Sequence, residues 1–149
     1  MTQRMRLNET APEAYEGFMQ VHRAIKNGPL TTKLQELIKI RASQLNGCAF
    51  CVDLHIRDAR RSGEPEDRIN HLTVWRESPL YDDAERAALA YTEAVTRREP
   101  VTDELWATLT GLFDETELAN VVALVSLINA LNLFGVPLKM RPPNRLAAV

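Results

Sequence analysis

Helix-start signals recur along this chain, and they constrain its fold more than any other feature. In a capping box, a Ser, Thr, Asp or Asn at the helix start is followed three residues later by Glu or Gln, and each side chain binds a free backbone N–H group. Four segments fit this pattern: Thr10–Glu13, Thr32–Gln35, Asp82–Glu85 and Asp114–Glu117. The alternating pattern of a strand is hard to find. We therefore expect an all-α protein, a bundle of six or seven helices.

Gly and Pro residues supply the matching stop signals. Together with the start signals they predict helices over about residues 11–27, 32–46, 48–61, 64–72, 83–98 and 103–111, and a long apolar helix after Asp114. The segment 75–80 is expected to be a connection, because Pro79 biases the residue before it away from helix. The tail from Pro142 is expected to be irregular.

Length and composition are typical of one globular domain over residues 1–149. The net charge of −2 and the pI near 5.9 give no electrostatic reason to expect a nucleic acid or an anionic membrane as a partner. Two cysteines are too few for a disulfide-rich secreted scaffold, and the first residues, MTQRMRLNE, lack the apolar run of a signal peptide. We therefore expect a cytoplasmic protein.

The stretch from Leu118 to Leu138 contains no charged residue and is long enough for a membrane span. It also contains Asn129 and Asn132, whose amides would need hydrogen-bond partners in hydrocarbon. We therefore favour a central helix buried in its own domain or against another subunit. Its apolar surface exceeds what a small bundle hides easily, which favours an oligomer.

The two cysteines of the chain, Cys48 and Cys51, are three residues apart, and His55 follows one helical turn after Cys51. With 3.6 residues per turn, all three side chains fall on one mostly apolar face of the predicted helix 48–61. The charged residues of this helix lie on the opposite face. The sulfurs are therefore expected to face inward or into a cleft.

Several kinds of chemistry use a Cys-x-x-Cys pair. A thioredoxin-like site requires a βαβ context, which is absent here. A structural zinc site usually requires four ligands, and beyond His55 the chain offers only the distant His22 and His71. A redox dithiol requires a thiolate and a second thiol. His55 favours a thiolate at Cys51, whereas the helix N-terminus favours one at Cys48, so position alone leaves the attacking sulfur open.

Glu36 lies about three turns before the turn at Gly47, roughly 16 Å along the helix axis if the flanking helices form a hairpin. On the residues alone it is an ordinary solvated glutamate.

A wider pattern changes that interpretation. Glu36, followed twelve residues later by Cys48 and then by Cys51 and His55, resembles the Glu, Cys-x-x-Cys, His constellation of the alkyl hydroperoxidase D-like family, within the carboxymuconolactone decarboxylase superfamily. The similarity extends over roughly Leu30 to Asn132 and includes the segments IKIRASQLNGCAFCVDLH (38–55), WRES (75–78) and ERAALA (85–90).

The resemblance implies an all-helical subunit that assembles as a homotrimer or homohexamer and reduces hydrogen peroxide or alkyl hydroperoxides. It implies that Cys51 is the peroxidatic thiol, that Cys48 resolves the sulfenic acid to a disulfide, and that His55 and Glu36 relay the proton. An external dithiol of unknown identity would then restore the thiols. No metal or organic cofactor is required.

One position departs from the family prototype, which has a second histidine just before the second cysteine, where this chain has Phe50. The decarboxylase branch lacks the cysteine pair, so lactone decarboxylation is disfavoured. We predict a dithiol peroxidase. The alternative is a non-enzymatic protein whose thiols respond to oxidants or bind a metal.

Other polar and aromatic residues are given structural roles. His22 and His71 are assigned to the surface or to helix packing, since no chemical group lies at helical spacing from them. Asn129 and Asn132 are expected to join helices as buried amides, with lining of the pocket as the alternative. Trp75 and Trp106 are expected to anchor the core or an interface.

Overall fold

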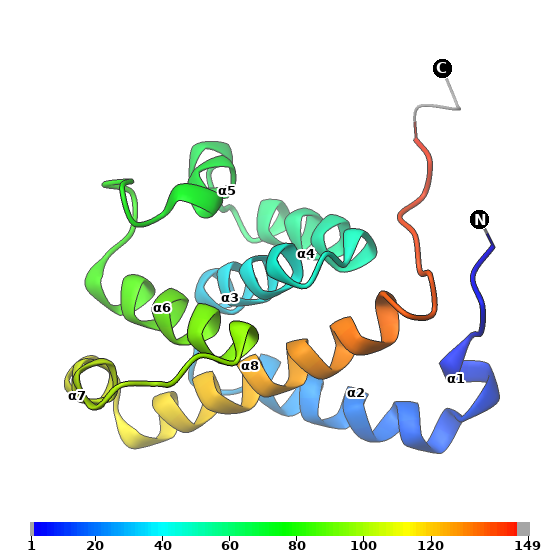
Figure 1. Ribbon diagram of the computed structural model, residues 1–149, viewed down its shortest axis with the longest axis horizontal. Coiled ribbons are helices and arrows are strands. Elements are labelled where there is room, and N and C mark those ends of the chain that lie inside the picture. Colours follow the sequence, from blue (N-terminus) through cyan, green and yellow to red (C-terminus); the bar gives the residue numbers. More distant parts are fainter. Residues whose placement is uncertain (1, 146–149) are drawn as a thin grey trace.

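A computed structural model describes residues 2–145, and over this range the chain forms helices without a strand (Figure 1). The all-α prediction is confirmed. In chain order the elements are α1 (Leu7–Thr10), α2 (Pro12–Lys26), α3 (Thr32–Leu45), α4 (Ala49–Arg61), α5 (Glu66–His71), the 3-10 helix η1 (Leu72–Val74), α6 (Asp83–Arg97), α7 (Asp103–Leu112) and α8 (Glu115–Gly135). The short α1 was not predicted, and the other α-helices correspond to the seven expected segments.

Two of the predicted capping boxes form as expected. Asp82 accepts a hydrogen bond from the Glu85 N–H (2.8 Å), and the Glu85 carboxylate accepts one from the Asp82 N–H (2.9 Å). Asp114 and Glu117 make the same reciprocal pair at the start of α8. These interactions are local, so the sequence alone places the starts of both helices.

The other two predicted capping boxes are wrong. The Thr10 hydroxyl donates to the Arg6 carbonyl in the short α1, so it does not cap α2, whose N-cap is Ala11. At α3 the cap is Thr31, whose hydroxyl accepts from the Leu34 N–H (3.3 Å). Gln35 donates instead to the backbone carbonyls of Ile25 and Leu30, so it anchors the α2–α3 connection and does not cap α3.

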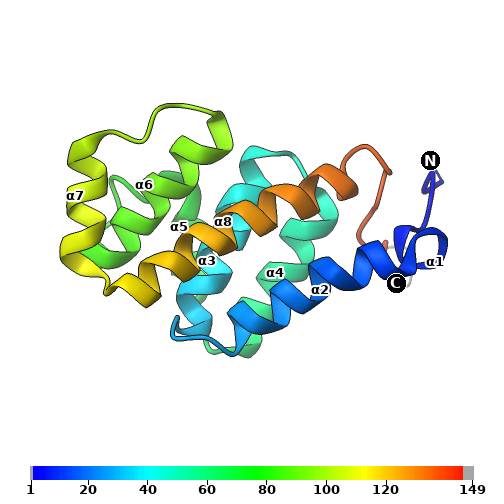
Figure 2. The same ribbon diagram turned by 90° about the horizontal axis from the view of Figure 1, so that it is seen from below.

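Helix α3 lies at the centre of the molecule and packs most extensively against α4, α6 and α8, as the two perpendicular views show (Figure 2). Ile38 contributes to a core shared with α8, where Val121 and Val125 are fully buried. On another side, Leu37 and Ile40 pack in a second core with residues of α4, α5, η1 and α6. Apolar burial on several sides of α3 leaves its polar residues inside the fold, where they require partners.

Helix α8 is the one helix among the described residues that is long and apolar enough to cross a membrane. It packs against α2, α3, α4, α6 and α7, as the core helix of a soluble protein does. The Asn46 amide donates to both Asn129 and Asn132 (2.9 Å each), and Asn132 donates to Ser43 (3.0 Å). The two asparagines therefore join α8 to the C-terminal end of α3, as expected, with Asn132 buried and Asn129 half-buried.

Candidate active site

The two cysteines lie at the start of α4. Gly47 ends the turn after α3 with a positive φ of 69°, a conformation that suits glycine. Cys48 is the N-cap residue of α4, and its sulfur accepts a hydrogen bond from the Cys51 N–H (3.3 Å). The two side chains are joined as a disulfide, with Cα atoms 5.3 Å apart. The expectation that both sulfurs lie on one side of the helix and close enough to bond is therefore met.

His55 and Glu36 face each other across the α3–α4 hairpin. Glu36 lies three turns before the turn and His55 about two turns after Cys48, so the antiparallel helices bring them level. The Glu36 Oε2 atom lies 3.0 Å from His55 Nδ1, and both side chains are buried. Glu36 therefore contacts the histidine and not the cysteines. It belongs to the site through His55, although it lies about three helical turns from the turn that carries the cysteines.

Lys39 completes a buried charged group with this pair. Its Nζ atom donates to Glu36 Oε1 (2.6 Å), and Lys39 is only 4 % exposed. Burial raises the pKa of Glu36, but the hydrogen bonds and charges of His55 and Lys39 outweigh it, so the pKa lies below its ordinary value. Glu36 is therefore held as a carboxylate that orients the His55 ring.

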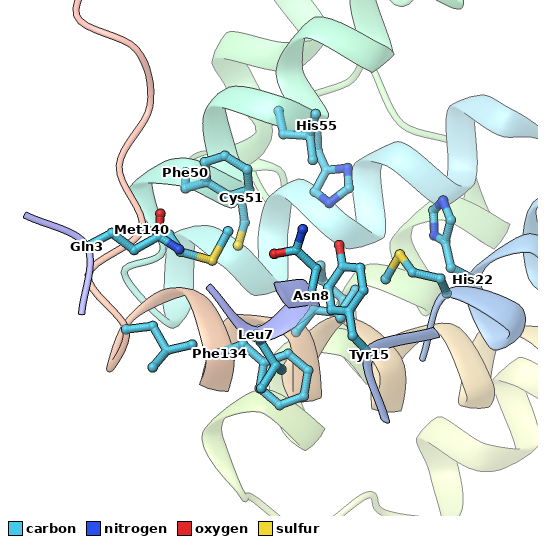
Figure 3. A pocket seen from close by; sticks show the side chains of 15 residues that line it. Gln3, Leu7, Asn8, Tyr15, His22, Phe50, Cys51, His55, Phe134 and Met140 are labelled. Atoms are coloured by element: carbon cyan, nitrogen blue, oxygen red, sulfur yellow. The ribbon is translucent and has the colours of Figure 1, made fainter. Parts of the chain in front are cut away.

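An apolar cavity of about 180 Å³ opens beside Cys51 and His55 (Figure 3). Its lining comes from α1, α2, α4, the end of α8 and the segments near both ends of the described chain: Gln3, Leu7, Asn8, Tyr15, Met19, His22, Phe50, Cys51, Leu54, His55, Ile128, Leu131, Phe134, Leu138 and Met140. None of these residues carries a carboxylate, an ammonium or a guanidinium group. The cavity therefore suits an uncharged, mainly apolar molecule.

Helix α2 brings two polar side chains to this cavity that the sequence analysis did not assign to the site. Figure 3 shows the Tyr15 hydroxyl pointing into the cavity toward His55, with His22 further along the same helix. Burial lowers the pKa of His22, and the neighbouring Lys39 and His55 lower it further. The sequence analysis assigned His22 to the surface or to helix packing, and the structure places it half-buried in the lining of this cavity. No sequence signal indicated it, because its neighbours in the site belong to other helices.

His71, Trp75 and Trp106 do not line the cavity. His71 is exposed on α5, and its Nδ1 atom lies 3.0 Å from the Ser78 hydroxyl. Trp75 is buried and donates to Glu93 (2.9 Å), which agrees with its assignment as a core anchor. Trp106 is 43 % exposed on α7. Phe50 lines the cavity at the position where the family prototype has a second histidine.

Within residues 2–145, one group of side chains has the geometry to hold a metal ion. Ligand atoms of Glu36, His55 and Asp58 lie within 4.8 Å of one another. The Lys39 ammonium group already neutralises the Glu36 carboxylate, and a cation there would compete with it. The dithiol does not contribute to this group. A cation bound there would have to compensate for the loss of the Lys39–Glu36 ion pair.

The chain is all-helical, and it has a Cys-x-x-Cys pair at the start of a helix next to a buried histidine–glutamate pair. These features are those of the alkyl hydroperoxidase D-like class of proteins. The family model for carboxymuconolactone decarboxylases matches residues 12–94. The chain belongs to this family and is of the alkyl hydroperoxidase D-like type.

Similar proteins extend this result over most of the chain. The uncharacterized protein YdfG of Bacillus subtilis is 37% identical over 147 residues, which cover 97% of this chain and all of that protein. ATU0492 from Agrobacterium tumefaciens, a protein of unknown function proposed to be the antioxidant defence protein AhpD, has a solved structure with a TM-score of 0.91. It is 35% identical, covering 95% of this chain and 99% of that one.

A more distant structure shares the fold alone. The debrominase Bmp8 in complex with 2,3,4-tribromopyrrole superposes with a TM-score of 0.83 at 20% identity, covering 94% of this chain and 76% of that one. The same helical framework therefore serves proteins with different described activities, and the function of this chain has to be argued from its own site.

Proposed function

We propose that this protein is a dithiol-dependent peroxidase that reduces hydroperoxides through Cys51 and Cys48. The observation that carries the proposal is the position of Cys51, which is bonded to Cys48, lies one turn before His55 and lines the apolar cavity. A thiol that reacts with peroxide requires a base to form the thiolate and a second thiol to resolve the product. This arrangement supplies both.

In the first step the Cys51 thiolate attacks the terminal oxygen of ROOH. An S–O bond forms and the O–O bond breaks, which gives a sulfenic acid at Cys51 and an alkoxide that takes up a proton to become ROH. Because Glu36 engages His55 Nδ1, the other ring nitrogen is left to exchange a proton with the thiol or the departing oxygen. Glu36 and His55 together relay this proton.

In the second step the Cys48 thiolate attacks the Cys51 sulfur. The S–S bond forms, the S–O bond breaks, and the departing hydroxide takes a proton to become water. An external dithiol then reduces the disulfide, gives up two electrons and becomes a disulfide itself. The uncharged cavity favours organic hydroperoxides, while hydrogen peroxide is small enough to enter as well.

The peroxide proposal is tested by measuring hydroperoxide consumption with excess dithiothreitol. We expect no turnover from Cys51→Ser, and a rate of Cys51 oxidation in His55→Ala that is lower by about 100-fold, because proton transfer contributes on that scale. In Cys48→Ser, Cys51 should be oxidised to a sulfenic acid in a single turnover, and no disulfide should form. Mass spectrometry after alkylation distinguishes these products.

His71→Ala is the matched control, because His71 is an exposed histidine far from the cavity. Its turnover should equal that of the wild type. Turnover that persists in Cys51→Ser would refute the proposal. Stoichiometric oxidation without turnover, or tight binding of zinc by the thiols, would favour the alternative of a non-enzymatic redox or metal-responsive protein.

A further inference from the structure

The two cysteines of the disulfide line different cavities. Cys51 lines the apolar cavity beside His55, whereas Cys48 lines a separate cleft of about 690 Å³. The polar and charged part of that cleft consists of Ser43, Gln44, Asp53, Arg57, Arg60 and Arg145. Each cysteine therefore borders one cavity, and the two cavities differ in chemical character, although both side chains are largely buried.

We propose that the Cys48 cleft binds an anionic thiol reductant, which attacks Cys48 and releases Cys51 as the thiolate. This proposal rests on the proposed peroxidase function and names the class of its second substrate. A thiolate displaces sulfur from a disulfide by approaching the attacked sulfur from the side opposite the leaving sulfur. Because Cys48 and not Cys51 lines the cleft, a reductant bound there attacks Cys48 in this proposal, and Cys51 is the leaving sulfur.

The charges of the cleft favour an anion. Arg57 and Arg145 both bind Asp53, at 3.3 Å and 2.6 Å, so the carboxylate of the cleft is paired with two guanidinium groups. Arg60 also lines the cleft and is paired outside it with Glu66. Three arginines and one aspartate leave the lining with an excess of positive charge.

Arg57 also offers a hydrogen bond that the fold does not use. Its Nε–H group is buried, and it has no partner among the described residues, 2–145. A buried donor without a partner costs free energy, which a small rearrangement of the Arg57 side chain toward a carboxylate of the reductant would recover. The apolar cavity on the Cys51 side contains no charged group of this kind, so an anionic thiol would lose its hydration there without compensation.

The exchange is balanced in two steps. The reductant thiolate forms a bond to the Cys48 sulfur while the Cys48–Cys51 bond breaks, and Cys51 leaves as a thiolate into the pocket of His55. A second thiol of the reductant then attacks the reductant sulfur of the mixed disulfide and frees Cys48. The protein disulfide gains two electrons, the two reductant thiols become a disulfide, and their two protons pass to Cys48 and Cys51.

The test compares two small thiols that differ in charge, thioglycolate and 2-mercaptoethanol, as reductants of the oxidised wild-type protein. The rate of disulfide loss is measured by alkylation and mass spectrometry at successive times, in the absence of peroxide. In the double variant Arg57→Gln, Arg60→Gln, we expect the ratio of the thioglycolate rate constant to the 2-mercaptoethanol rate constant to fall about tenfold, as electrostatic steering would give. Comparing ratios removes the intrinsic difference in thiol reactivity.

Arg61→Gln is the matched control, because Arg61 is exposed on α4, pairs with Asp58 and does not line the cleft. Its ratio should equal that of the wild type. A ratio that is unchanged in the double variant, or that falls equally in Arg61→Gln, would overturn the proposal. Since no peroxide is present, a failure here is distinguishable from a failure of the peroxidase reaction.

A second measurement tests which sulfur faces the cleft. The single-cysteine variants Cys51→Ser and Cys48→Ser are treated with 5,5′-dithiobis(2-nitrobenzoate), an anionic disulfide whose thiol product is coloured. Adding Arg57→Gln should slow the reaction of Cys48 and leave that of Cys51 unchanged. Equal slowing of both sulfurs, or no slowing of Cys48, would contradict the assignment of the cleft to Cys48.

Discussion

Gly135, at the C-terminal end of α8, lies directly against the disulfide. A Cβ atom at this position would be 2.6 Å from the Cys48 sulfur and 3.3 Å from the Cys51 sulfur. The first distance is shorter than any ordinary contact, and the disulfide leaves the Cys48 sulfur little freedom to move away. The absence of a side chain at Gly135 therefore allows α8 to pack against the start of α4.

For Gly135→Ala we expect a loss of about 1–3 kcal/mol in the free energy of unfolding of the oxidised protein, the usual cost of overpacking a core. Denaturant unfolding of the oxidised protein measures this change. Gly111→Ala is the control, because a Cβ atom on Gly111 in α7 would meet nothing within 4 Å. It should be neutral or slightly stabilising. Equal midpoints for the two variants would contradict the predicted clash.

At the scale of the elements, the central helix α3 carries buried polar residues that find partners elsewhere in the fold. Arg41 of α3 donates to Glu93 of α6 (2.8 Å), and Trp75, from the connection after η1, donates to the same carboxylate (2.9 Å). Arg76 and Arg97 also bind Glu93, which is 1 % exposed. One buried carboxylate therefore holds together α3, α6 and the connection between η1 and α6.

Glu93 gives the stability of the protein a defined pH dependence. Burial raises its pKa, but hydrogen bonds from Arg76, Trp75 and Arg41 lower it from the ordinary 4.5 to about 2. Because the folded pKa lies below the unfolded one, the carboxylate stabilises the fold fully above pH 4.5, and this contribution is lost as the pH falls toward 2.

We expect Glu93→Gln to lower the free energy of unfolding at neutral pH by about 3 kcal/mol, since it leaves buried Arg41 without its charged partner. Thermal unfolding as a function of pH should show that the difference in stability between Glu93→Gln and the wild type becomes smaller below pH 4.5. Glu99→Gln, an exposed glutamate after α6, is the control and should follow the wild type. A stability difference that does not change with pH would show that Glu93 does not titrate as described.

At the scale of the whole molecule, the end of α8 presents apolar side chains to solvent. Leu133 is 65 % exposed and Val136 is 45 % exposed, although the other side of the same helix lies in the core. Exposed apolar residues on a core helix are typical of a subunit interface. The homotrimer or homohexamer that the sequence predicts stays a prediction, and this surface is where we expect contact between subunits.

Light scattering coupled to size-exclusion chromatography tests the assembly. We expect the wild type to elute as a trimer or hexamer and Leu133→Glu to dissociate, because a buried unpaired charge is costly at an apolar interface. Val74→Glu is the matched control, since Val74 is 57 % exposed in η1, away from α8. A monomeric wild type, or dissociation by the control and not by Leu133→Glu, would contradict this assignment.

The sequence by itself determined what depends on neighbours along the chain. The capping pairs at Asp82 and Asp114 were predicted correctly, because both partners of each hydrogen bond lie within one helical turn. The common face of Cys48, Cys51 and His55 follows equally from helical periodicity. The same kind of argument was wrong at Thr10, because its hydroxyl bonds to the preceding turn of an unpredicted short helix.

Only the tertiary structure decided which residues from different helices meet. Glu36 pairs with His55 because the hairpin turns back at Gly47, and residue spacing alone had placed Glu36 far from the dithiol. His22 and Gly135 reach the site from α2 and α8, and no local pattern indicated either. The physical reason is that helix packing is set by apolar surfaces across the whole core, whereas caps and periodicity depend on a few consecutive residues.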